Sequence, residues 1–120
     1  MRRGEIWTVA GGSDYTGKPR PAAILQDDRF DATDSVTICL FTSDATDAPL
    51  LRILVEPGAE NGLDAPCRLM VDKLTTVRRT RLGTRLGHLR EEDMIRLQQA
   101  VLVFLGFAGS RRAAGEKMGG

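Results

Sequence analysis

The chain has 120 residues, of which 42% are hydrophobic, and its formal net charge at pH 7 is +1. This length fits one domain with a single compact core, and the charge excludes a protein that holds nucleic acid by bulk electrostatics alone. No apolar run is long enough to cross a bilayer, and no apolar stretch follows the basic start as in a signal peptide. We therefore expect a cytoplasmic protein without a membrane association, in which Cys39 and Cys67 are free thiols.

Short segments rich in β-forming residues make up most of the chain. The first of these segments alternates, and the second is largely apolar, as in a buried strand. The Gly-, Asp- and Ser-rich stretches between the segments are typical of turns. The segment 74–77 either continues the fifth strand or starts a new one. The other predicted strands are 4–9, 21–26, 36–41, 51–55, 67–71 and 86–89.

The last predicted element is a helix over residues 91–105. Three carboxylates open it, where the positive end of the helix dipole favours them. Its apolar positions recur at helical spacing at Met94, Leu97, Val101 and Phe104. The sequence thus predicts a mainly β domain over residues 1–109, a small curved antiparallel sheet or barrel closed by one C-terminal helix. A flexible tail, 110–120, would follow it.

The charges are unevenly distributed along the chain. Between residues 27 and 64, nine acidic residues accompany two arginines, whereas between residues 68 and 90 seven basic residues accompany one aspartate. The second segment could face a polyanion, or it could be an ordinary solvated face.

Arg20 lies between Pro19 and Pro21 at the entrance to the second strand. Both prolines restrict the backbone around it, so its guanidinium is pre-positioned, and guanidinium matches phosphate oxygens. Thr42, at the end of the third strand, could donate a hydrogen bond to the same group. Taken alone, these stretches favour an exposed loop arginine at Arg20 and a strand-ending turn at Thr42.

Several kinds of active site are missing from the sequence. His88 is the single histidine, and neither cysteine has a second ligand at metal spacing or a neighbouring base. We expect no metal ion and no cofactor. RNA carries its own nucleophile, the 2′-hydroxyl, which needs only alignment and stabilisation of charge on the phosphate.

The whole pattern resembles the MazF/PemK family of toxin endoribonucleases. The matching segments run in order from the start of the chain to the helix: 3–7, 17–25, 41–43, 69–77, 86–89 and 91–105. The resemblance implies an SH3-like barrel of the CcdB/MazF type, a homodimer, and a groove for single-stranded RNA. It also implies a cognate antitoxin that inserts a disordered acidic segment along that groove.

The resemblance further implies the chemistry and the site. Arg20 and Thr42 match the catalytic pair of the family, whose cleavage needs no metal or ribosome and leaves a 2′,3′-cyclic phosphate and a 5′-hydroxyl. Further RNA contacts are expected at Asp14, Lys18, Ser43, Asp72, Lys73 and Thr76.

The sequence departs from the family pattern in two places. The loop before Arg20 has one extra residue, and its Tyr15 is either a platform for base stacking or an ordinary loop residue. Lys73 and Thr75 stand where the family carries glutamine and arginine, which changes the expected base or phosphate contacts.

Two alternative functions differ in class. A gyrase poison of the CcdB type on the same fold would need an apolar C-terminus with a tryptophan, but the only tryptophan is Trp7. A barrel adaptor that binds peptide would explain the curved sheet but not the arginine–threonine pair.

Overall fold

The computed structural model describes residues 1–10, 18–45 and 47–107. Asp14 and Tyr15, and the tail 110–120, lie outside these ranges, so the expectations for them stay predictions.

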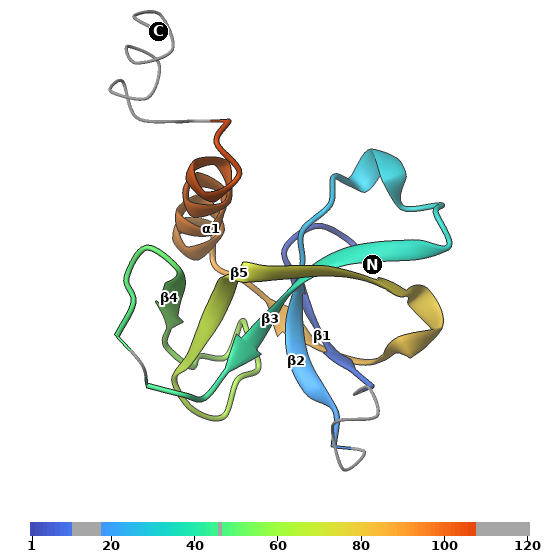
Figure 1. Cartoon of the computed structure of the whole chain (residues 1–120). Helices are drawn as coiled ribbons and strands as arrows, with labels where there is room; N and C mark the ends of the chain where they lie inside the picture. The colour runs from blue at the N-terminus through green and yellow to red at the C-terminus, as the bar shows by residue number, and fades with distance from the viewer. Residues whose placement is uncertain (11–17, 46, 108–120) are drawn as a thin grey trace, which may run out of the picture.

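The described chain forms one curved, antiparallel sheet and one long helix (Figure 1). The six strands lie in the order β4-β5-β3-β2-β1-β6. This confirms the predicted mainly β fold with a C-terminal helix. The elements are β1 (Glu5–Val9), β2 (Arg20–Ile24), η1 (Asp28–Phe30), β3 (Ser35–Thr42), β4 (Arg52–Val55), β5 (Cys67–Arg78), η2 (Arg79–Arg81), β6 (Leu82–His88) and α1 (Glu91–Phe104).

β5 is one continuous strand of 12 residues, which settles the alternative left open at residues 74–77. Its register against β3 shifts between the pairs Phe41↔Leu69 and Cys39↔Leu74, so two residues of β3 are matched by five of β5. Such a bulge bends a strand. The first part of β5 pairs with β4 and the second part with the start of β3.

β6 begins four residues earlier than predicted, at Leu82. Residues 82–85 show no apolar alternation, but they pair with β1, and a Cβ at Gly83 would lie 2.7 Å from the Thr8 Oγ1 atom. A larger residue here would have to displace the Thr8 hydroxyl, and this close approach of β1 is invisible in the local pattern.

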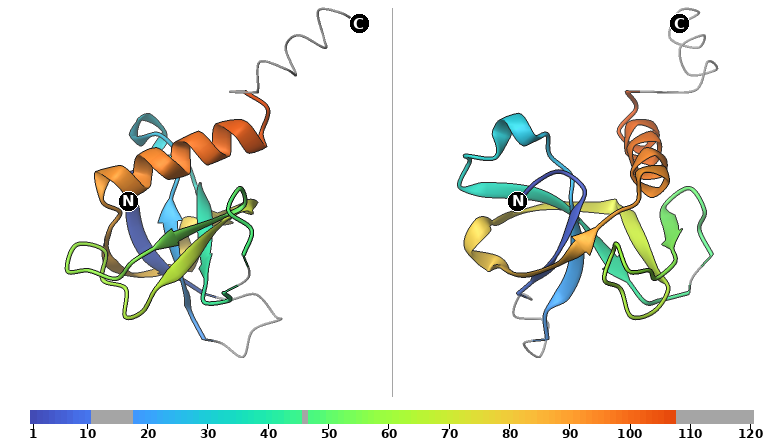
Figure 2. Two further views of the ribbon diagram at one scale, coloured as in Figure 1. Left: turned by 90° about the vertical axis from the view of Figure 1, so that its left-hand side faces the viewer. Right: turned by 180° about the vertical axis from the view of Figure 1, so that it is seen from behind.

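The sheet buries apolar side chains on both faces. α1 lies across one face, where Leu97 is fully buried among residues such as Ile6 and Phe41 (Figure 2). Burying one leucine of this kind contributes roughly 1.5–3 kcal/mol to folding. A second, smaller core on the other face consists of Val9, Ala22, Ile24, Val36, Ile38 and Val77.

The helix agrees with its prediction except at its end. Leu97 faces the core and Met94 and Val101 are partly buried, whereas Phe104, from the same apolar stripe, is 45% exposed. The N-terminal carboxylates include Asp93, which is buried and accepts a hydrogen bond from Arg96 at 3.1 Å. No helix in the described part of the chain is both long and apolar enough to span a membrane.

Candidate active site

The two residues expected to carry the chemistry lie at the ends of neighbouring strands. β2 begins at Arg20 and β3 ends at Thr42. Ala22 pairs with Leu40, and the same register continued by two residues places Arg20 opposite Thr42. Directly opposed residues of an antiparallel pair extend to the same face, with Cβ atoms about 4.5–5.5 Å apart. The structure therefore brings together the pair that the sequence predicted.

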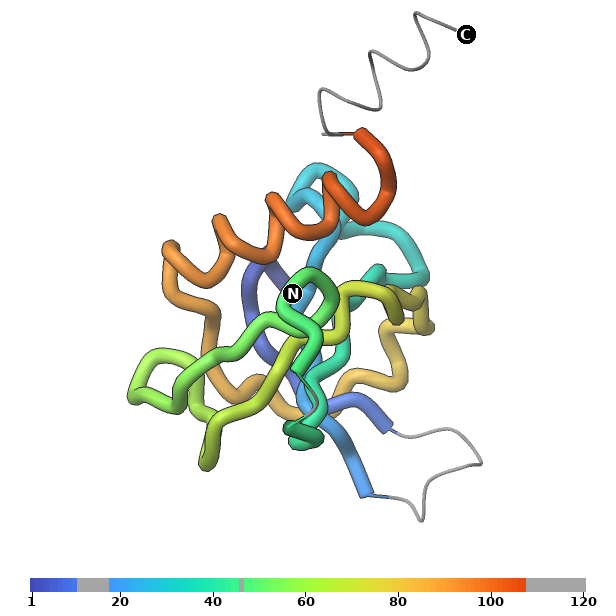
Figure 3. Tube along the Cα trace, turned by 60° about the vertical axis from the view of Figure 1, so that its left-hand side comes forward, coloured from blue at the N-terminus to red at the C-terminus, as the bar shows by residue number. Residues whose placement is uncertain are grey.

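One cavity of about 210 Å³ contains both residues in its wall. The C-terminal end of β1 and the N-terminal end of β2 lie next to this cavity, on the side of the molecule away from α1 (Figure 3). Lys18 and Ser43, two of the predicted RNA contacts, also line it. The cavity combines two cationic side chains and two hydroxyls with apolar surface, which suits a phosphate attached to an organic group. Its full lining is Lys18, Pro19, Arg20, Pro21, Phe41, Thr42, Ser43 and Cys67.

The backbone at Arg20 is held from both sides. Pro19 and Pro21 fix their own φ angles, and Arg20 itself pairs with Val9 of β1. The side chain of Arg20 therefore starts from a fixed backbone position, so no backbone freedom is lost when its guanidinium binds a phosphate.

The hydroxyl of Thr42 also has a defined orientation. The backbone N–H of Asp44 donates a hydrogen bond to the Thr42 Oγ1 atom at 3.1 Å, which is the turn motif expected for this sequence. Because the oxygen accepts this bond, the hydroxyl proton points elsewhere and can be donated to a phosphate oxygen.

Cys67 is the one thiol in the cavity wall, and it is poorly suited to covalent catalysis. Burial, and to a smaller extent the charge of Asp64, raises the pKa of its thiol above the ordinary value. Its Sγ atom also donates a hydrogen bond to the carbonyl oxygen of Ala65 at 3.3 Å. The neutral thiol is therefore favoured near pH 7.

Three further predicted RNA contacts lie outside this cavity. The carboxylate of Asp72 pairs with the guanidinium of Arg52 on β4. The hydroxyl of Thr76 is 2.8 Å from that of Thr37, its partner across β3 and β5. Lys73 is exposed in the bulge of β5. Their contact with RNA stays a prediction.

Arg68 is a candidate that the sequence did not single out. It pairs directly with Thr42, so Arg20, Thr42 and Arg68 form a row across three strands. Within residues 1–10, 18–45 and 47–107, its side chain has no hydrogen bond or ion pair. Locally it is a basic residue at the start of an apolar strand, and only the register of β5 against β3 places it beside Thr42.

The remaining titratable groups do not assemble a metal site. In the described part of the chain, no three His, Cys, Asp or Glu side chains are close enough to hold a metal ion. His88 is exposed on β6, with its Nδ1 atom 3.1 Å from the carbonyl oxygen of Leu89.

Solved structures of other proteins share this fold. A solved MazE–MazF complex from Deinococcus radiodurans superimposes with a TM-score of 0.74 at 19% identity, over 90% of this chain and 98% of the other. An endoribonuclease from a mycobacterial species, in complex with its cognate antitoxin, gives a TM-score of 0.73 at 19% identity, over 92% and 97% of the two chains.

Sequence comparison is more specific. A protein of Mycolicibacterium smegmatis, named probable endoribonuclease MazF, is 59% identical over 109 residues, which cover 91% of this chain and all of the relative. The family model for the PemK-like, MazF-like toxin of type II toxin–antitoxin systems matches residues 2–105. The family model covers nearly all of the residues that the structure describes, and the chain therefore belongs to the PemK/MazF toxin family.

Proposed function

We propose that this chain is the toxin of a type II toxin–antitoxin pair and that it cleaves single-stranded RNA at selected sequences, independently of the ribosome and of metal ions. The observation that carries the proposal is the placement of Arg20 and Thr42 in the wall of one cavity. The name of the M. smegmatis relative, probable endoribonuclease, supports the same activity.

The reaction needs few groups from the protein. The 2′-oxygen of the ribose bonds to the adjacent phosphorus, and the bond from phosphorus to the 5′-oxygen breaks. One proton leaves the 2′-hydroxyl and one reaches the departing 5′-oxygen, giving a 2′,3′-cyclic phosphate and a 5′-hydroxyl. Arg20 stabilises the negative charge on the phosphate oxygens and takes part in proton transfer, while Thr42 donates a hydrogen bond.

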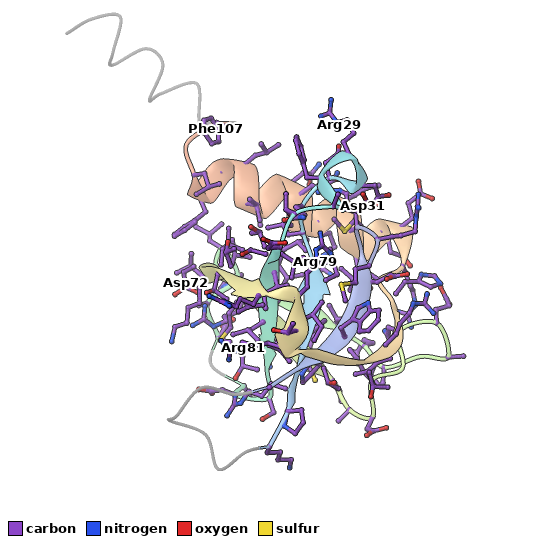
Figure 4. The ribbon with its side chains drawn as sticks, turned by 90° about the vertical axis from the view of Figure 1, so that its right-hand side faces the viewer. Arg29, Asp31, Asp72, Arg79, Arg81 and Phe107 are labelled. Atoms are coloured by element: carbon purple, nitrogen blue, oxygen red, sulfur yellow. The ribbon has the colours of Figure 1, made fainter. Side chains whose placement is uncertain are left out.

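We infer that the toxin acts as a homodimer. Apolar side chains gather at the end of α1, and Phe107, just beyond it, is 79% exposed (Figure 4). Several exposed apolar side chains at one end of a helix indicate an interaction surface, and a second copy would cover it. The patch consists of Leu102, Val103, Phe104, Leu105 and Phe107.

The antitoxin would compete with RNA for the same surface. Lys18, Arg20 and Arg68 make the end of the sheet cationic, so an acidic disordered segment could lie where the RNA backbone runs. Solved relatives from Deinococcus and a mycobacterial species contain toxin and antitoxin together. Both the antitoxin and the RNA substrate would be met in the cytoplasm.

Cleavage of a long RNA by the purified protein in the presence of EDTA tests the proposal, with primer extension to map the cut sites. Cleavage should persist in the chelator. Arg20→Ala should lower the rate at least about 100-fold, since it removes stabilisation of transition-state charge. Its melting temperature should stay near that of the parent.

Arg29→Ala is a matched control, because Arg29 is an exposed arginine of η1 whose ion pair is with its neighbour Asp27. It should cut at the parental rate. Cleavage by Arg20→Ala at the parental rate would refute the catalytic assignment, and loss of all cleavage in EDTA would refute the metal-independent reaction.

A further inference from the structure

A second cavity, of about 160 Å³, shares Arg20 with the candidate active site. It lies on the face of the sheet opposite α1, beside the smaller core. Most of its wall is aliphatic, and three polar side chains, Arg20, Thr75 and Arg81, interrupt it. The aliphatic part consists of Val9, Ala10, Ile38, Leu40 and Val77.

Arg81 is fixed at one side of this cavity. It comes from the turn η2 between β5 and β6 (Figure 4). Its guanidinium donates a hydrogen bond to the carbonyl oxygen of Ala10, and the N–H of Ala10 donates to the Arg81 carbonyl oxygen at 2.9 Å. The first bond orients the flat, charged guanidinium at the cavity wall, and the second holds the backbone of Arg81 beside Ala10.

Thr75 supplies the one uncharged polar side chain of the wall. It pairs with Ile38, which places it on the face of the smaller core, and it is partly buried. Among the residues the structure describes, its hydroxyl has no hydrogen-bond partner. A partly buried hydroxyl can both donate and accept, so the cavity offers one unused site of hydrogen bonding beside aliphatic walls.

We propose that this cavity binds the base of a nucleotide adjacent to the RNA bond that is cut. The inference rests on the proposed function. A nucleobase is flat, has two π-faces that pack on aliphatic and guanidinium surfaces, and carries hydrogen-bonding groups on its edge. Arg81 stacks against the face of the base, and the hydroxyl of Thr75 bonds to its edge.

The position of Arg20 connects the base to its phosphate. A nucleotide separates its base from its phosphate by one ribose, so the two groups occupy neighbouring sites. Arg20 lines both cavities, with the phosphate-binding side at Thr42 and the aliphatic side at Leu40. A free phosphate would leave the aliphatic walls in contact with water, so the base is the better occupant.

The test uses a short RNA with one mapped cut site and a series of versions in which one nucleotide at a time is abasic. With the wild-type protein, removal of the base at one nucleotide flanking the cut should lower kcat/KM about 10- to 100-fold, the usual effect of losing a stacked base. Thr75→Phe fills the cavity. In this variant, removal of the base at that nucleotide should no longer change kcat/KM, whereas the effect of removing any other base should stay as in the wild type. Thr84→Phe, the same replacement at an exposed position of β6, should behave as wild type.

Thr75→Val keeps the volume and removes the hydroxyl, and it serves if Thr75→Phe does not fold. It should retain the abasic effect but lose most of the preference among the four bases at that nucleotide. If the wild-type protein cuts RNA with no abasic effect at either flanking nucleotide, or if both Thr75 variants keep the parental base preference, the base site is refuted while the nuclease stands. Absence of all RNA cleavage would overturn the proposed function and this site with it.

Discussion

The ion pair between Arg52 and Asp72 fastens β4 to β5 beside the bulge and can be broken with little change of shape. Their side chains are only 17% and 25% exposed. Hydrogen bonds to charged groups contribute about 1.5–3 kcal/mol, and fully exposed ion pairs about 0.2–1 kcal/mol. The contribution of a mostly buried ion pair to stability should lie between these values. We therefore expect Asp72→Asn, which preserves the side-chain shape, to lower the free energy of unfolding by about 1–2 kcal/mol.

A double-mutant cycle measured by urea unfolding isolates the pair. Arg52→Met removes the charge and retains most of the chain length, so the double variant should be little less stable than either single variant. The coupling energy should be about 1 kcal/mol. Additive losses, with coupling below about 0.3 kcal/mol, would show that the pair does not form in solution. That result would leave the Asp72 carboxylate available for the RNA contact predicted from the sequence.

Three further predictions concern stability, RNA binding and thiol reactivity. Asn61→Ala should cost about 2–4 kcal/mol in urea unfolding, because the buried amide makes three hydrogen bonds to the backbone of residues 56–63; a loss below 1 kcal/mol would contradict this. Arg68→Ala should weaken RNA binding and leave base preference unchanged. It should also lower, by about 1, the slope of the logarithm of the RNA-binding constant against the logarithm of the salt concentration, and an unaltered slope in anisotropy titrations would exclude a phosphate contact. Burial raises the pKa of the Cys39 thiol to about 12, so at pH 8 mass spectrometry should find iodoacetamide on Cys67 well before Cys39, and equal rates would contradict the burial.

The strands and the helix could be predicted because each carries its own local pattern. The apolar run 36–41 is flanked on both sides by turn-forming residues and became part of β3, and the carboxylates and spaced apolar residues of 91–105 became α1. β6 was only partly predictable. Gly83 and its neighbours are strand residues because β1 lies against them, and that contact is between segments more than 70 residues apart.

Arg20 and Thr42, the proposed catalytic pair, could be singled out because the segments around them resemble the MazF/PemK family. Taken alone, two prolines beside an arginine and a threonine followed by turn formers also fit an exposed loop arginine and a strand-ending turn. Arg68 has no such feature. It joins the pair only through its register with Thr42, which depends on how β5 is aligned with β3.

The bulge of β5 decides which side chains reach the second cavity. Side chains alternate between faces, so an odd shift of register turns every later residue to the other face. The three extra residues of β5 between Leu69 and Leu74 are such a shift, and they place Thr75 opposite Ile38 and Thr76 opposite Thr37. Had the register of Phe41 with Leu69 continued unshifted, Asp72 would lie opposite Ile38, and Thr75 would lie on the other face of the sheet. The proposed base site therefore depends on the length of a bulge whose size no local pattern indicates, whereas the proposed catalytic residues lie in segments whose resemblance to the family is visible in the sequence.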